Sequence, residues 1–140
     1  EPSPHIDWSV GNLKLLADLS HFLVGREFAW PIDETNHGYI HELLDHSWAF
    51  HGRVASREQV QIEISLPQHK KWLEPFLDSW DYGFRSWRKR NPEDATCAFV
   101  CEFGPKPYAI TGPDGNDTTD RWQESLMLQD LIRETWAKSA

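Results

Sequence analysis

Three short segments of the chain combine apolar residues with a final side chain that can bind a metal. Residues 13–18 form a mostly apolar run that ends in Asp18, with the length of a buried strand in a parallel sheet. Residues 48–54 and 96–103 alternate instead, placing small or polar side chains on one face and large apolar ones on the other. We therefore predict three strands, with Asp18, His51 and Glu102 near their ends.

Segments with helical periodicity lie between and after these predicted strands. Thr35-Asn36 opens a stretch in which residues 39–44 carry an apolar stripe typical of a short helix, and a final helix is expected to be capped at Thr119 or Asp120. The longest helix should run from about residue 67 to 90, because aromatic residues recur there every four positions, at Trp72, Phe76, Trp80 and Phe84. Pro75 predicts either a kink or the start of a second helix.

The order strand, helix, strand, helix, strand, helix is typical of an α/β fold with parallel strands and outer helices. The carboxyl ends of parallel strands gather at one edge, where ligands bind. An isolated Asp-x-x-His pair would be an ordinary strand-to-loop turn, but three strand ends offer carboxylate, imidazole and carboxylate at Asp18, His51 and Glu102. This donor set suits a divalent metal such as Mn, Mg, Co or Zn.

Other segments leave alternatives open. The run 60–64 alternates like a strand but is equally compatible with an extended active-site loop. His37 and His41 are spaced one helical turn apart and could hold a metal, but without a third ligand a solvated helix face is favoured. Cys97 and Cys101 lie on one face of the third strand, too far apart to pair, so we expect buried free thiols.

Length, charge and composition limit the kinds of partner and the compartment that we expect for this chain. A length of 140 residues suits a single domain over residues 1–140. The net charge of −8 disfavours nucleic acid and anionic membranes, and favours a small solute or a divalent cation. The sequence has no membrane-spanning run and no signal peptide, and free thiols fit a reducing compartment, so we expect a cytoplasmic protein.

Three stretches together resemble the sugar phosphate isomerase/epimerase family of xylose-isomerase-like TIM barrels. They are residues 16–22 (Leu-Ala-Asp-Leu-Ser-His-Phe), 50–54 (Phe-His-Gly-Arg-Val) and 101–108 (Cys-Glu-Phe-Gly-Pro-Lys-Pro-Tyr). The resemblance implies the C-terminal part of a (βα)8 barrel, about three of the eight βα units that such a barrel builds from roughly 250 residues.

The resemblance also implies roles for particular residues. Asp18, His51 and Glu102 would ligate the metal, Glu102 would also act as a base, and His21 and Arg53 would bind substrate oxygens. The family has a further glutamate that is both ligand and catalytic acid/base, and Glu1 is its candidate here.

The expected activity is metal-dependent isomerisation or epimerisation of a sugar or sugar phosphate, by proton transfer next to a carbonyl. Two alternatives remain: a non-catalytic half-barrel binding or assembly module or fragment, and a zinc phosphodiesterase of the endonuclease type on the same barrel. Because three strands leave two sheet edges open, we expect a homo-oligomer or a complementary half-barrel chain. The isolated chain should turn over a sugar weakly or not at all.

Overall fold

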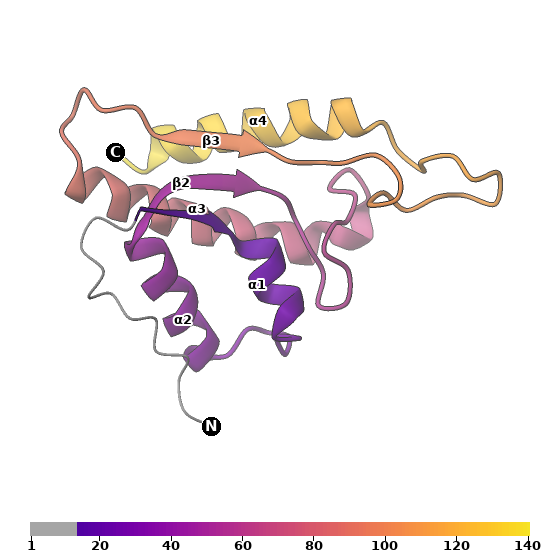
Figure 1. The fold of residues 1–140 in the computed structure, drawn as a ribbon, viewed down its shortest axis with the longest axis horizontal. Helices are drawn as coiled ribbons and strands as arrows, with labels where there is room; N and C mark the ends of the chain where they lie inside the picture. The colour runs from indigo at the N-terminus through magenta and orange to yellow at the C-terminus, as the bar shows by residue number, and fades with distance from the viewer. Residues whose placement is uncertain (1–13) are drawn as a thin grey trace.

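The computed structural model describes residues 14–140 and contains a parallel sheet of three strands (Figure 1). The strands are β1 (Leu15–Asp18), β2 (Ser47–Gly52) and β3 (Ala98–Cys101), in that spatial order. Their register aligns Asp18 with His51, and His51 with Val100. The expectation of an α/β fold with parallel strands is confirmed, although each strand is shorter than predicted.

Helices follow every strand. They are α1 (Leu19–Gly25), α2 (Glu34–Asp45), α3 (Lys70–Arg90) after the short 3-10 helix η1 (Pro67–His69), and α4 (Arg121–Lys138). Aspartates cap three of them: Asp18 begins α1, Asp33 begins α2 and Asp120 begins α4, each accepting a hydrogen bond from a backbone N–H of the first turn. The cap at Asp120 was one of the two predicted positions.

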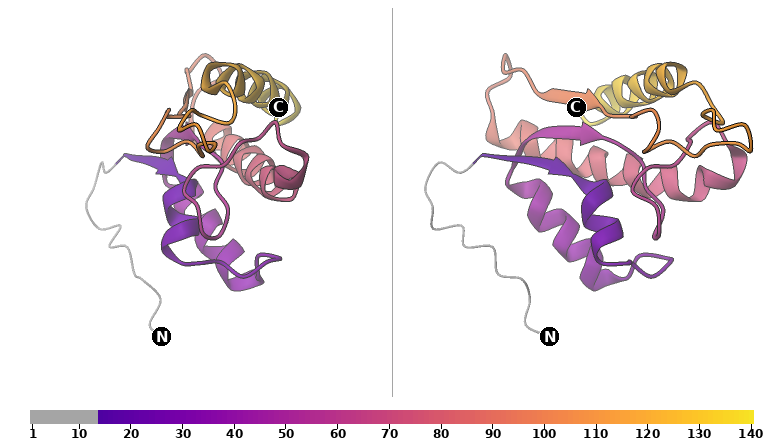
Figure 2. Two further views of the ribbon diagram at one scale, coloured as in Figure 1. Left: turned by 90° about the vertical axis from the view of Figure 1, so that its right-hand side faces the viewer. Right: turned by 45° about the vertical axis from the view of Figure 1, so that its right-hand side comes forward.

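The helices lie on one side of the sheet (Figure 2), and this separates the two faces of each strand. Ala17 and Phe50 point toward the helices and are buried, whereas Leu16 and Val100 on the other face remain 49% and 52% exposed. Phe50 makes an edge-to-face contact with Phe84 of α3, with ring centroids 5.3 Å apart. Aromatic packing therefore fixes the sheet on α3.

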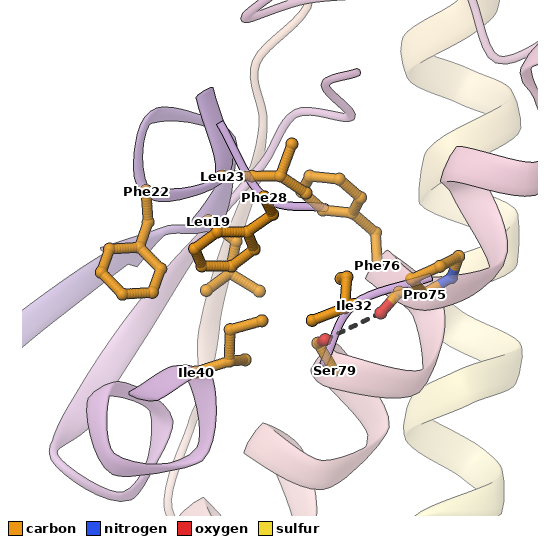
Figure 3. A pocket seen from close by; sticks show the side chains of 9 residues that line it. All are labelled: Leu19, Phe22, Leu23, Phe28, Ile32, Ile40, Pro75, Phe76 and Ser79. Atoms are coloured by element: carbon orange, nitrogen blue, oxygen red, sulfur yellow. Dashed lines mark hydrogen bonds between the residues drawn. The ribbon is translucent and has the colours of Figure 1, made fainter. Parts of the chain in front are cut away.

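A second part of the core fills the space between α1, α2 and α3 (Figure 3). Leu19, Phe28, Ile40 and Phe76 line a residual cavity of about 10 Å³, which is no larger than about one water molecule. In α3, on the same wall as Phe76, Ser79 donates its hydroxyl hydrogen to the Pro75 carbonyl at 2.7 Å. This region is a packed seam between helices and offers no room for a ligand.

The structure adds one helix to the expected elements and decides two alternatives that the sequence left open. Helix α1 was not predicted at all, whereas α2 begins at Glu34, one residue before the predicted opening at Thr35. Helix α3 continues through Pro75, so no second helix starts there. Of the two alternatives for the run 60–64, the structure shows irregular chain rather than a strand, with residues 61–64 buried. Within residues 14–140, no helix is both long and apolar enough to cross a lipid bilayer.

Candidate metal centre

The carboxyl ends of the three strands bring Asp18, His51 and Glu102 together. Asp18 and His51 are neighbours in the β1–β2 register, and the backbone N–H of Glu102 donates to the Gly52 carbonyl at 2.8 Å. One donor atom from each of the three side chains lies within 4.8 Å of the others. The predicted convergence is confirmed, because parallel strands deliver their ends to one edge.

The distances within this triad suit adjacent ligands of one cation. His51 Nδ1 lies 3.2 Å from Glu102 Oε2 and 3.9 Å from Asp18 Oδ2. Bonds of about 2.0–2.2 Å to one metal place neighbouring ligand atoms roughly 3 Å apart. Glu102 Oε2 is also buried and makes no hydrogen bond, and its neighbours in the structure are the ion-pair partners His51 and Arg53. The chemistry and spacing of these residues therefore fit a divalent metal.

Arg53 supplies positive charge beside the triad. Its guanidinium, only 7% exposed, places Nη2 2.7 Å from Asp18 Oδ2 and 3.3 Å from Glu102 Oε2. Its Nε donates to the Ser20 hydroxyl at 2.9 Å. Arg53 thus holds both carboxylates at the strand ends, and Ser20 fixes the orientation of the guanidinium.

His21 lies next to Arg53 but faces water. It is the third residue of α1, its side chain is 64% exposed, and its Nε2 lies 2.7 Å from Arg53 Nη2. At this distance the imidazole accepts a hydrogen bond from Arg53 through Nε2. His21 and Arg53 therefore lie together at the edge of the triad, as their predicted roles toward one substrate require.

Asp18 is held in its ionised form. Burial of the carboxyl opposes ionisation, but hydrogen bonds from Ser20 and the charge of Arg53 outweigh it, so the pKa of Asp18 lies below its ordinary value. The same carboxylate accepts the Ser20 backbone N–H at 3.0 Å and thereby caps α1. An ionised Asp18 is the form that a metal requires.

The remaining candidate residues do not extend the triad. Glu1 lies outside the described residues. His41 stacks on Tyr82 with ring centroids 3.8 Å apart, and its ring centroid lies 6.2 Å from that of His37. Within residues 14–140, Asp18, His51 and Glu102 form the single group of three or more such side chains close enough to share a metal.

The two cysteines are free and half-buried, which partly matches the expectation of buried thiols. Burial raises the pKa of Cys97 to about 11, and burial also raises the pKa of Cys101. Both thiols are therefore protonated at neutral pH and are poor ligands and nucleophiles.

Sequence reasoning gave no role to Tyr108 or Gln61, although both lie by the site. The Tyr108 ring is centred 5.9 Å from the Arg53 guanidinium carbon, and the residue is 55% exposed. Gln61 is buried and hydrogen-bonded to Gly104, two residues beyond Glu102. Tyr108 belongs to the stretch 101–108 that carries the family resemblance, whereas nothing in the hydrophobic pattern of the sequence indicated a role for Gln61.

Comparisons with protein-family models, with curated proteins and with solved structures found no match to this chain.

Proposed function

We propose that this chain is part of a TIM barrel and carries the metal site of a sugar isomerase or epimerase. The observation that supports the proposal is the convergence of Asp18, His51 and Glu102 at the carboxyl ends of three parallel strands, with Arg53 and His21 beside them. Active sites of such barrels lie at this end of the sheet.

The arrangement of the layers supports a barrel segment. A doubly wound sheet carries helices on both faces, whereas the strands of a barrel carry all of their helices on the outer face. Here the helices lie on one side of the sheet (Figure 2). The opposite face carries Leu16 and Val100, which are the kind of branched residues that fill a barrel interior.

Each side chain of the site has its own role in the proposed proton transfer. When bound by Asp18, His51 and Glu102, a divalent metal would polarise substrate oxygens as a Lewis acid. Glu102 would remove the proton from the carbon next to the substrate carbonyl and return it to the former carbonyl carbon, while the hydroxyl proton passes to the carbonyl oxygen, so that an aldose becomes a ketose. Epimerisation would need a second acid on the opposite face of the substrate. Arg53 and His21 donate hydrogen bonds to substrate oxygens, and Asp18 and Ser20 keep Arg53 in place for this task.

A second candidate is a binding or assembly module without catalysis. One observation favours it: Arg53 already bridges the carboxylates of Asp18 and Glu102, so this cluster is held together by protein charges alone. Metal binding separates the two candidates. A structural cluster does not need a cation, whereas the isomerase site requires one for its activity.

Calorimetric titration with Mn²⁺ at neutral pH tests the proposal. We expect one site per chain, and we expect His51→Ala to weaken binding by about 100-fold or more, since second-shell losses alone reach 10- to 100-fold. His37→Ala is the matched control, because His37 is exposed on α2 and should leave the affinity unchanged. Equal effects of the two substitutions would contradict the assignment.

Turnover is a separate test. With Mn²⁺ or Co²⁺ added, we expect the chain alone to convert aldoses and ketoses weakly or not at all, because three βα units provide only part of a barrel pocket. Mixing with the complementary part of the barrel should raise the rate. Fast turnover by the isolated monomer would show that the pocket is complete without a partner.

A further inference from the structure

A buried glutamine joins the loops that follow β2 and β3. Gln61 is 3% exposed, and its side-chain amide pairs with the backbone of Gly104 in both directions. Its Nε2 donates to the Gly104 carbonyl at 2.8 Å, and its Oε1 accepts from the Gly104 N–H at 2.8 Å. We call this arrangement the Gln61–Gly104 amide pair.

The amide pair lies between the two strand ends that carry site residues. On one side, Ile62 N–H donates to the Val54 carbonyl at 2.9 Å, which anchors the loop of Gln61 next to Arg53. On the other side, Gly104 lies two residues beyond Glu102. The backbone around Glu102 is therefore fixed at two points. The N–H of Glu102 donates to the Gly52 carbonyl, and the N–H of Gly104, two residues later, donates to Gln61 Oε1.

The same pair supports Tyr108. A Cβ atom on Gly104 would lie 3.3 Å from Tyr108 Cδ2, so the tyrosine ring packs closely on the backbone that Gln61 holds. A turn with Tyr108 N–H donating to the Pro105 carbonyl at 3.0 Å leads the ring back over Gly104. Gly104 is thus the common support of Glu102 on one side and Tyr108 on the other.

Only an amide side chain can form this pair, because it needs a donor and an acceptor side by side. A carboxylate at the same position would direct an acceptor at the Gly104 carbonyl, and an apolar side chain would leave two backbone groups without their partner. Filling space alone would not require an amide side chain at position 61.

We propose that Gln61 is a positioning residue that fixes the backbone of Glu102, and thereby its carboxylate, for the metal. The inference rests on the proposed function for the metal itself, but the positioning of Glu102 is a property of the metal-free chain. Second-shell groups that orient ligands typically change metal affinity by 10- to 100-fold when they are removed.

The first experiment needs no metal. Amide hydrogen exchange is measured by NMR in the wild-type chain, in Gln61→Glu and in Gln61→Met, which avoids a buried charge. We expect faster exchange at Gly104 and also at Glu102, whose own hydrogen bond goes to Gly52, with no change at Asp130 in the middle of α4. Unchanged exchange at Glu102, or equal acceleration throughout the chain, would overturn the positioning role. Gln68→Glu, at an exposed glutamine, is the control for added charge.

The second experiment is a double-mutant cycle with Mn²⁺. We expect Gln61→Met to weaken binding about 10-fold in the wild-type background and by less than 2-fold in the Glu102→Gln background, because Gln61 acts through Glu102. Equal losses in both backgrounds would overturn the inference.

The two experiments separate the two claims. If the wild-type chain binds no Mn²⁺, the proposed function fails, and hydrogen exchange alone decides whether Gln61 positions Glu102. If Mn²⁺ binds but exchange at Glu102 is insensitive to Gln61, the metal site stands and the positioning role is wrong.

Discussion

At the scale of single residues, several side chains of the site serve two purposes. Asp18 caps α1, pairs with Arg53 and offers a carboxylate oxygen to the triad. Sequence could identify Asp18, His51 and Glu102 because strand ends are visible in the hydrophobic pattern. It could not place Arg53 between the carboxylates, since that contact depends on the conformation of a long side chain that follows the central strand β2 and lies between Asp18 and Glu102.

The lowered pKa of Asp18 predicts a pH dependence of stability. Its folded pKa lies below the ordinary value of 3.8, so the stabilisation is fully present above about pH 4 and is lost as the pH falls through the folded pKa. Asp18→Asn should therefore lower the melting temperature at pH 7, and the difference from wild type should shrink below pH 4.

The control for this experiment is Asp130→Asn, because Asp130 is exposed and its contact with Arg133 at 3.8 Å lies on the surface. We expect it to change the melting temperature little at either pH. A deficit of Asp18→Asn that stays constant from pH 7 to pH 3 would show that the ionised carboxylate is not what stabilises the fold.

At the scale of elements, alternation identified the strands, but in the run 60–64 it left strand and loop open, and the structure shows a loop. Ile62 and Ile64 are buried together with the polar residues Gln61 and Glu63, whereas Val60 is half-buried. The polar ones bond to the chain beyond β3: Gln61 to Gly104, and Glu63 to the N–H of Ile110. Alternation therefore reflects polar contacts between loops here. Helix α1 was missed because it is only seven residues long and begins directly after β1.

The contact between β2 and β3 gives a sharp test of packing. A Cβ atom on Gly52 would lie 2.2 Å from Phe99 Cε1, so Gly52→Ala must displace the aromatic ring and should cost about 1–3 kcal/mol of unfolding free energy. In chemical denaturation we expect a clear drop of the midpoint.

Gly38→Ala is the matched control. Gly38 lies within α2 with open space around its Cβ position, so the same substitution should stabilise the protein by roughly 0.5–1 kcal/mol. Effects of the same sign at both positions would contradict the close approach of β2 and β3.

At the scale of the whole molecule, β1 and β3 form the two edges of the open sheet that residues 14–140 build. The half-exposed Leu16 and Val100 lie on its uncovered face. Unpaired strand edges beside apolar surface favour association with another chain. The order of strand-like and helix-like segments correctly predicted an α/β protein, but no pattern in the sequence could show how such edges are covered, because that depends on a second chain or a distant segment.

We therefore expect self-association, or association with a complementary half-barrel chain. Sedimentation at micromolar concentration should show a species larger than the monomer, and Val100→Glu should shift it toward the monomer without loss of helical circular dichroism. Gln123→Glu, on the exposed side of α4, is the control for charge. A wild-type chain that remains a compact monomer at every concentration would contradict this expectation.

The metal centre is tested most directly by the proton NMR spectrum of the Co²⁺ complex. A paramagnetic ion shifts the ring protons of a coordinated imidazole far outside the ordinary range, and the chain has seven histidines that could respond. We expect one set of strongly shifted imidazole signals, lost in His51→Ala and retained in His37→Ala. Shifted signals that persist without His51, or none in the wild-type chain, would contradict a metal held by Asp18, His51 and Glu102.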